Sequence, residues 1–452
     1  MLSIDPTRQR TAFCEDLEIF HGEGLEGWAI LSCDAGRNKW NTVLGPVLDP
    51  HPRGALWMYN YKAAAEGHVE GNKSFELPAL LRLDGFPKEF DFHPIGADAV
   101  PAVDSANEET RKPARLFVIN HSGKWSAIEV FDLYPALKAS EWSASYIRTI
   151  DHPLAALQPN ALTALSHNDI LVTQDHLFAL RARPFSQLRQ IYSFLYGEPM
   201  GSALTCFASL PILRGYLTKI ETILGLRTGF VTRVQIEEDH DRVSVSLFDR
   251  GIAFANGIAR SPNGEIVAVA STMMPGVLLY ERQHTSKGFE WTITDYIFTP
   301  NMADNIAFSR NLVASEQGER SYFGNGSQLL VTGAISGPMM VRFAKDPKNM
   351  SRASPSWVVA ITPKAKDVER TEDNAPLPVQ ERLLGLHDRY EIKTLYQGHK
   401  PTPLSAPHYG FGLVGITAAA GASMDVTVGG GTLLVAGILS DPGVMICYGV
   451  GQ

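Results

Sequence analysis

Pairs of short apolar segments, each pair joined by turn-forming residues, recur along most of this chain. Examples are residues 114–120 with 126–133, 169–175 with 176–180, 264–272 with 276–283, and 432–439 with 443–450. Apolar runs of this length separated by Gly, Asn, Asp or Ser are typical of β-hairpins. Because the pairs recur at similar intervals without strict self-similarity, they predict a β-propeller with diverged blades. A β-sandwich is the alternative, but repetition over 452 residues favours radial closure.

One segment, residues 179–229, departs from this pattern because its apolar residues recur every three to four positions. That spacing predicts two or three amphipathic helices. No run of eighteen apolar residues occurs in it, which argues against a membrane-spanning helix. We expect a lid over the propeller mouth, because the segment directly follows Asp175 and His176. Peripheral contact with a membrane and a plain packing insertion are the alternatives. Residues 1–452 are then one propeller domain that carries this insertion.

Composition excludes some classes of protein. Hydrophobic residues make up 44% of the chain and charged residues 19%, which describes a soluble globular protein with a large core. The net charge of −8 argues against a nucleic-acid partner, because such a partner requires a basic face. The four cysteines form no CxxC pair, which argues against a zinc site. The first thirteen residues lack the apolar core of a signal peptide, yet four N-glycosylation triplets would permit secretion, so the compartment stays open.

A set of carboxylate and amide side chains lies beside apolar runs in segments that are far apart in sequence. Apolar flanks place these groups at strand ends that point inward, where an unpaired polar group is costly. Calcium takes six to eight oxygen ligands of these kinds. The set therefore predicts one buried cation at the centre of a radial fold. Its members are Glu15, Asp16, Asn160, Asn256, Asp304 and Asn305.

Taken in order, the segments CEDLEIF, LFVINH, PNALTAL, TQDH, FANGIARSPNG and DNI resemble the paraoxonase/arylesterase family between Glu15 and Asn305. Each motif is weak alone, and the Asn-Gly in FANGI could be an ordinary turn; the ordered set is more specific. The resemblance implies a six-bladed propeller, closed by pairing of the first strand with the last blade, with two calcium ions in a central tunnel.

The resemblance also assigns ligands. The catalytic ion, a Lewis acid on a lactone or ester carbonyl in the family, would be held by Glu15, Asn160, Asn256, Asp304 and Asn305. The second ion would use Asp16 and an aspartate after Asn160, but this chain has Ala161 there. We therefore expect one calcium ion, with the second site weakened or empty.

This chain departs from the family where the family reads Asn-Pro-His-Gly. Here the segment is FHPIG, so Ile95 stands in place of the histidine that serves as general base, and His93 lies two residues earlier. His121 in VINHS matches the family's second histidine. Candidate catalytic residues are thus His93 and His121, and Ile95, Asp175 and His176 are candidate substrate contacts.

Two further departures concern a histidine and the cysteines. Ala334 stands at the place of a fifth-blade histidine of the family. The family's propeller-closing disulfide lacks its N-terminal partner here, because Cys14 adjoins Glu15, so Cys447 is expected to be a free thiol.

A retained Lewis-acid site without the base favours a reaction that needs no activated water. Our leading hypothesis is a biosynthetic enzyme that binds an apolar, carbonyl-bearing small molecule, terpenoid or polyketide in character, and promotes ring formation such as a hetero-Diels–Alder reaction. The second hypothesis, weighed nearly equal, is a calcium-dependent lactonase or aryl ester hydrolase with His93 or His121 as base. The third is a non-catalytic binding platform.

Overall fold

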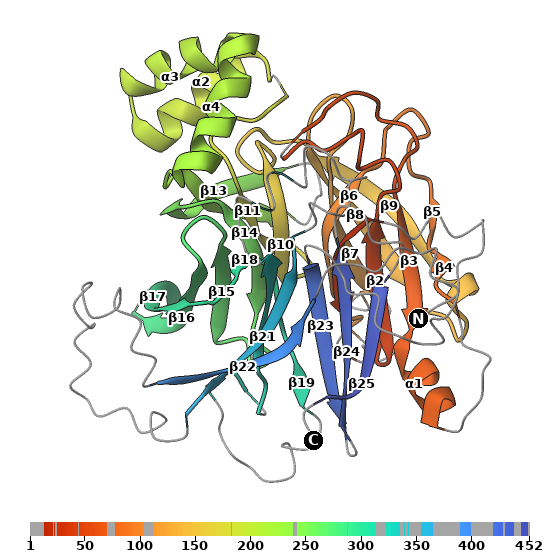
Figure 1. Ribbon diagram of the computed structural model, residues 1–452. Coiled ribbons are helices and arrows are strands. Elements are labelled where there is room, and N and C mark those ends of the chain that lie inside the picture. The colour runs from red at the N-terminus through yellow and green to blue at the C-terminus, as the bar shows by residue number, and fades with distance from the viewer. Residues whose placement is uncertain are drawn as a thin grey trace.

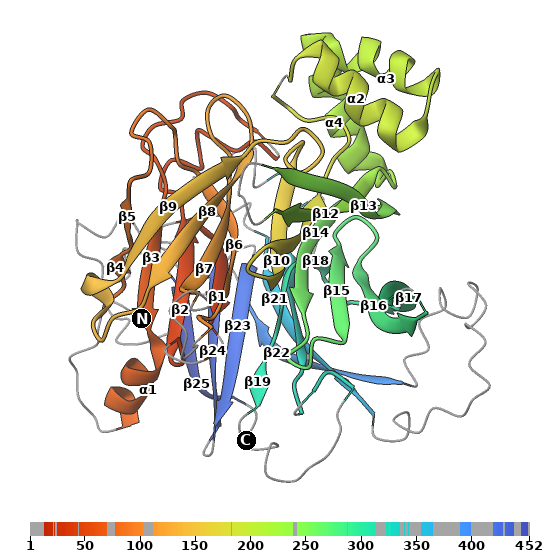
Figure 2. The ribbon, with the colours of Figure 1, turned by 180° about the vertical axis from the view of Figure 1, so that it is seen from behind.

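The computed structural model shows a ring of six β-sheets around a central axis (Figures 1 and 2). It describes residues 13–311 (without 21, 23–24, 44, 70–76, 104–111, 182, 238–241 and 287), 322–334 (without 325), 339, 342, 354–364, 389–398, 419–427, 430–437 and 444–450. The predicted six-bladed β-propeller with a helical insertion is confirmed. The assignment of all 452 residues to one domain stays a prediction.

The first sheet runs outward from the tunnel through β1 (Cys14–Ile19), β2 (Trp28–Cys33), β3 (Ala55–Asn60) and β4 (Ala79–Leu80). The second contains β6 (Pro94–Val100), β7 (Ala114–Asn120), β8 (Ala127–Tyr134), β9 (Ser143–Ile150) and β5 (Arg82–Asp84). The third contains β10 (Pro159–Ser166), β11 (Asp169–Gln174), β12 (Gly229–Ile236) and β13 (Val243–Ile252).

The fourth sheet contains β14 (Ala255–Arg260), β15 (Ile266–Ser271), β16 (Gly276–Thr285) and β17 (Gly288–Phe298). The fifth contains β18 (Met302–Phe308), β20 (Leu329–Ala334), β21 (Ser356–Pro363) and β22 (Tyr390–Gln397). The sixth contains β23 (Ala419–Thr427), β24 (Gly430–Gly437) and β25 (Val444–Val450), with β19 (Arg310–Asn311) paired in parallel to β23.

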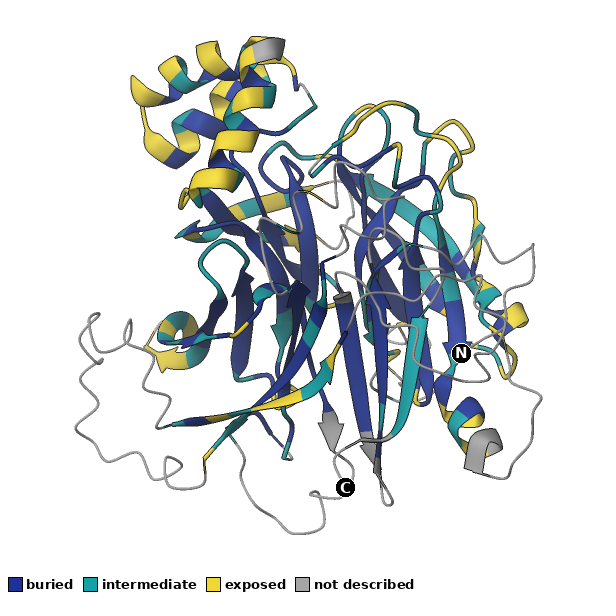
Figure 3. Ribbon diagram, in the orientation of Figure 1, coloured by how far each residue is buried: buried dark blue, intermediate teal, exposed yellow. Residues whose placement is uncertain are grey.

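The middle strands of the blades are apolar on both faces because each sheet packs against a neighbouring sheet on either side. β7 and β15, for example, are buried along their whole length (Figure 3). Separate core clusters fill the spaces between adjacent blades. This burial explains why these strands appear in the sequence as continuous apolar runs instead of alternating ones.

The inner strands β1, β6, β10, β14, β18 and β23 contact one another in a closed ring. Equivalent positions of neighbouring strands meet: the Ala97 amide donates to Asp16 (2.9 Å), and the Ala164 amide donates to Asp98 (2.8 Å). These strands therefore enter the tunnel from the same end, and their first residues surround one tunnel mouth.

β1 pairs with β2 in its own sheet. The expected pairing of the first strand with the last blade stays a prediction, because residues 1–12 lie outside the described part. Two other features were not expected from the sequence. Residues 176–180 form no strand, because the amides of Leu177 and Phe178 donate to Glu221 of a helix instead of to a neighbouring strand. Cys14 and Cys33 form a disulfide, because the two residues are register partners in β1 and β2. Cys447 is a free thiol, as expected.

Helices are few. α1 (Tyr61–Val69) and the short 3-10 helix η3 (Ala139–Glu141) lie between strands of the first two sheets. α2 (Phe185–Tyr196), α3 (Met200–Ser209) and α4 (Pro211–Leu224) form the predicted insertion, which connects β11 to β12 and stands above one end of the propeller (Figure 1).

Much of this insertion is exposed (Figure 3). The exposed residues include the apolar Phe194, Met200, Phe207, Tyr216 and Ile223. Among the described residues, none of the helices is both long and apolar enough to cross a bilayer. Contact of this face with a membrane stays a prediction, which sedimentation with phospholipid vesicles would test.

A glycine in an inner strand provides a direct test of how tightly the tunnel closes. A Cβ atom on Gly257 of β14 would lie 2.6 Å from the Asn305 Cα and the Ile306 nitrogen of β18. Since these are backbone atoms, we expect Gly257→Ala to lower the free energy of unfolding by about 1–3 kcal/mol. Gly215→Ala in α4 is the control: nothing lies within 4 Å of its Cβ, and it should stabilise by roughly 0.5–1 kcal/mol. Denaturant unfolding measures both, and equal stabilities would contradict the close approach.

Candidate active site at one end of the tunnel

The predicted cation ligands lie at the starts of four inner strands, at one end of the tunnel. Glu15 is on β1, Asn160 on β10, Asn256 on β14, and Asp304 and Asn305 on β18. All are buried except Asp304, which is partly buried.

Hydrogen bonds fix the amide groups of this set. The Asn256 Nδ2 donates to Asp304 Oδ1 at 2.6 Å and to Thr272 Oγ1 at 2.9 Å. The Asn305 Nδ2 donates to the Glu15 carbonyl oxygen at 3.0 Å. The Asn160 Nδ2 donates to Asp175 Oδ2 at 3.4 Å. Because the nitrogens are engaged, each side chain is held with its oxygen turned away from these partners.

Three oxygens of the set are left without a donor. Glu15 Oε2, Asn160 Oδ1 and Asn256 Oδ1 are buried and accept no hydrogen bond from the described residues. A buried acceptor without a partner costs roughly 1–3 kcal/mol, so such groups are retained where something else satisfies them. Three such oxygens at one tunnel end are a set that a hard cation fits. In the described part of the chain, no cluster of three or more His, Cys, Asp or Glu side chains forms a metal site by itself, so amide oxygens are needed here.

Burial disfavours the ionised form of the carboxyls at this end of the tunnel. Burial raises the pKa of Glu15 well above its usual value, although the nearby Arg37 guanidinium opposes this shift. Burial likewise raises the pKa of Asp304 to about 7, although the hydrogen bond from Asn256 opposes this shift. Both carboxyls would ionise more readily beside a divalent cation.

Arg37 is a functional candidate that sequence reasoning missed. It lies in the turn after β2, is 4% exposed, and its Nη2 donates to the Pro94 carbonyl oxygen at 2.9 Å. Its charge acts on Glu15, Asp304 and His121. No sequence pattern singles out Arg37, because its partners Glu15, Pro94 and Asp304 are distant from it in sequence or lie on other sheets.

The histidines differ in how many ring nitrogens are engaged. His121 Nε2 bonds to the Pro159 carbonyl oxygen at 2.7 Å and its Nδ1 meets Thr42 Oγ1, so both nitrogens have partners. Burial, with Arg181, lowers the pKa of His121 well below its usual value. His93 Nδ1 bonds to Asp34 Oδ2 at 2.8 Å, whereas its Nε2 is buried with no partner among the described residues. The roles given to these residues stay predictions, but this geometry favours His93.

Asp175 and His176 connect the oxygen set to the helical insertion. His176 Nδ1 bonds to Asp175 Oδ1 at 2.8 Å, and its Nε2 bonds to Thr222 Oγ1 of α4 at 2.7 Å. Burial alone lowers the pKa of His176, but the Asp175 charge and hydrogen bond and the Glu221 charge together raise it. Ile95, in contrast, packs in the core between the second and third sheets and does not line the tunnel cavity around Asp16.

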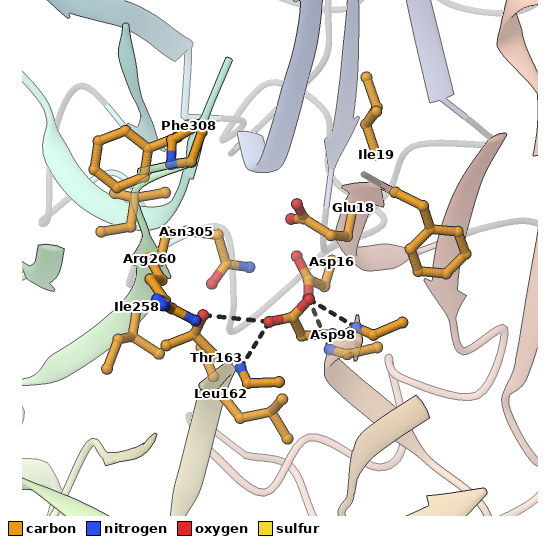
Figure 4. Close-up of a pocket in the computed structure, with 18 of the residues that line it drawn as sticks. Asp16, Glu18, Ile19, Asp98, Leu162, Thr163, Ile258, Arg260, Asn305 and Phe308 are labelled. Atoms are coloured by element: carbon orange, nitrogen blue, oxygen red, sulfur yellow. Dashed lines mark hydrogen bonds between the residues drawn. The ribbon is translucent and has the colours of Figure 1, made fainter. Parts of the chain in front are cut away.

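A cavity of about 360 Å³ lies farther along the tunnel and is lined by later residues of β1, β6, β10, β14 and β18 (Figure 4). Asp16, the predicted second-ion ligand, lines it, and its two oxygens accept from the Leu17 amide (2.8 Å) and the Ala97 amide (2.9 Å). Ala161 lines the same cavity, so no second carboxylate comes from β10 at that position.

Glu18 and Asp98 add two carboxylates to this cavity that sequence reasoning missed, and Arg260 lies across from them (Figure 4). Burial raises the pKa of Asp16 and of Asp98 to about 6, and it raises that of Glu18 well above its usual value, with Asp98 and Asp16 adding to the shift. Glu18 could have been found from the alternation in CEDLEIF, which places it on the same strand face as Asp16.

The fold and this site define a six-bladed β-propeller with an oxygen-rich candidate cation site at one end of its tunnel. No family model matches the chain. Over 222 residues it is 26% identical to serum paraoxonase/arylesterase 1 of Homo sapiens, and the match covers 48% of this chain and 46% of that protein. The chain thus matches about half the length of that relative.

Solved structures superpose on the chain only loosely. A luciferin-regenerating enzyme gives a TM-score of 0.38 at 10% identity, covering 96% of this chain and 88% of that one. A gluconolactonase from Xanthomonas campestris gives 0.33 at 13% identity, covering 97% and 96%. No inference about function is based on these superpositions.

Proposed function

We propose that this protein is a calcium-dependent hydrolase of lactones or aryl esters. The observation that carries the proposal is a group of three buried oxygens at one tunnel end, on Glu15, Asn160 and Asn256, which no described residue reaches with a hydrogen-bond donor. The similarity to a paraoxonase/arylesterase supports the same reading. Glu15, Asn160, Asn256, Asp304 and Asn305 would hold the ion, and a bound calcium ion supplies Lewis-acid polarisation of an ester carbonyl.

Two residues near these oxygens, Arg37 and His176, would assist the reaction. Arg37 places a fixed positive charge beside the acidic pair Glu15 and Asp304, where negative charge develops on a reacting carbonyl oxygen. His176, held by Asp175 and Thr222, keeps the base of α4 against the tunnel mouth and helps to exclude water.

Ring formation, our leading hypothesis from the sequence, rested on the loss of the base at Ile95. The paraoxonase similarity favours hydrolysis instead, and His93, two residues before Ile95, has a ring nitrogen without a partner among the described residues. We therefore place the hydrolase first, and a ring-forming reaction on an apolar carbonyl substrate becomes the alternative.

The test is turnover of a chromogenic aryl ester and of a γ- and a δ-lactone, with calcium and with a chelator. We expect turnover of at least one class that is lost with the chelator and restored by calcium. Thermal unfolding in parallel should show a higher Tm with calcium. No turnover of either class would contradict hydrolysis, and a Tm that ignores calcium and chelator would contradict the ion.

A further inference from the structure

Asp34 and His93 form a buried carboxylate–imidazole pair next to the candidate cation site. Asp34 follows β2 directly and His93 precedes β6, and each is 1% exposed. Asp34 Oδ2 lies 2.8 Å from His93 Nδ1, and Asp34 Oδ1 accepts from the Gly36 amide at 2.8 Å. The His93 backbone amide donates to Asn120 Oδ1 at 2.9 Å. Both side chains are therefore fixed in position.

The pair determines which ring nitrogen of His93 carries the proton. An ionised carboxylate accepts hydrogen bonds and donates none, so the proton of a neutral His93 lies on Nδ1. The lone pair then lies on Nε2, the atom that has no partner among the residues described. The same arrangement orients the histidine of serine-hydrolase triads, where the carboxylate selects the tautomer.

His93 is distinct from the other buried histidines at this tunnel end. Both ring nitrogens of His121 and of His176 already have partners. His93 alone among these three has a nitrogen that can accept a proton from a bound water, since a general base needs a free lone pair within hydrogen-bond reach.

Contacts of its neighbours place His93 beside the oxygen set. Pro94, the next residue, accepts a hydrogen bond from Arg37, whose charge acts on Glu15 and Asp304. His121, whose backbone amide donates to the His93 carbonyl oxygen at 3.0 Å, bonds through Nε2 to Pro159, the residue before Asn160. His93 thus lies between the strand starts that carry Glu15 and Asn160.

We propose that His93 is the general base of ester hydrolysis in this protein and that Asp34 is its positioning residue; this inference rests on the proposed function. His93 Nε2 takes a proton from water as the water oxygen bonds to the carbonyl carbon and the carbonyl π pair moves to its oxygen. When the tetrahedral intermediate collapses, the C–O bond to the leaving group breaks and His93 returns the proton to the leaving oxygen. Lactone and water give a hydroxy acid, and an aryl ester and water give an acid and a phenol.

The test combines kinetics with a spectroscopic measurement on His93→Gln, Asp34→Asn, Asp34→Glu and the exposed control His284→Gln. We expect His93→Gln and Asp34→Asn to lower kcat about 10²- to 10⁴-fold with little change in KM. Asp34→Glu, which keeps the carboxylate, should recover part of kcat, and His284→Gln should match the parent protein. A calcium-induced Tm shift retained in each variant shows that it is folded.

The ¹⁵N chemical shifts of the His93 ring supply a readout that does not depend on turnover. In the parent protein we expect the proton on Nδ1, and in Asp34→Asn we expect it on Nε2, because the asparagine amide donates to Nδ1. A proton on Nε2 in the parent protein overturns the proposal, as does a full kcat in His93→Gln. A parent protein with the Nδ1–H tautomer but no turnover of either substrate class overturns the proposed function, and the base role with it.

Discussion

Glu15→Gln should abolish the response to calcium and lower turnover about 10²-fold or more. Glu15 is 3% exposed and its Oε2 accepts no hydrogen bond from the part of the chain that the structure describes, so the substitution removes the ligand charge without changing the shape of the side chain. Ion binding at a hundredfold excess over its Kd stabilises a protein by about 2.7 kcal/mol, and the variant should lose this gain.

In the presence of a chelator, the effect of Glu15→Gln on the free energy of unfolding should have the opposite sign. Because burial raises the pKa of Glu15 well above its usual value, the ion-free protein carries an unfavourable buried carboxyl that glutamine replaces at little cost. The variant should then be at least as stable as the parent. Glu129→Gln is the matched control: Glu129 is also buried, it accepts from Asn120 and Thr149 away from the oxygen set, and its variant should keep the calcium response. A calcium response of equal size in Glu15→Gln would contradict the proposed site.

The ion-free protein should lose stability as the pH rises from about 4 to about 7. Burial raises the pKa of Asp16 and Asp98 to about 6 and that of Asp304 to about 7. A carboxyl whose pKa is higher in the folded state binds its proton more tightly there, so folding is disfavoured as the pH rises through the raised value. The rise in pKa corresponds to roughly 3 kcal/mol each for Asp16 and Asp98 and to roughly 4 kcal/mol for Asp304 before solvent screening, so the combined effect is several kcal/mol.

This loss of stability is measured as the Tm of the protein at a series of pH values with a chelator present. The same measurement on Glu18→Gln tests the contribution of one cavity carboxyl. Glu18 has no hydrogen-bond partner among the described residues, and its pKa is raised well above the usual value by burial and then by Asp98 and Asp16. The variant should match the parent at pH 4 and exceed it at pH 7.5, because only the ionised glutamate is disfavoured in the cavity. A Tm difference that is independent of pH would show that these carboxyls do not interact as described.

The fold and the oxygen set could be predicted from sequence, but the groups that support the site could not. The blades are visible as paired apolar runs, and Glu15, Asn160, Asn256 and Asp304 lie in motifs beside such runs. Asp34, in contrast, is 59 residues from His93 and lies in no pattern, since the two meet only when the first and second sheets pack together.

Register explains two other omissions. Cys14 and Cys33 become partners because β1 and β2 pair antiparallel with those residues opposite each other, and placing both strands in the sequence would have indicated the bond. Residues 176–180 are apolar enough for a strand, yet they pack against α2 and α4, and Glu221 takes the backbone hydrogen bonds that a sheet would need. Tertiary contacts thus overrode a local pattern.

The oxygens of the candidate site come from four blades and from residues as far apart as Glu15 and Asn305. A chain still emerging from the ribosome lacks part of this candidate site until β18 has been made, so the proposed ion could bind only after that point. Binding of the proposed ion would then stabilise the ring only late in its assembly. We expect proteases to cleave the chain most readily before that binding.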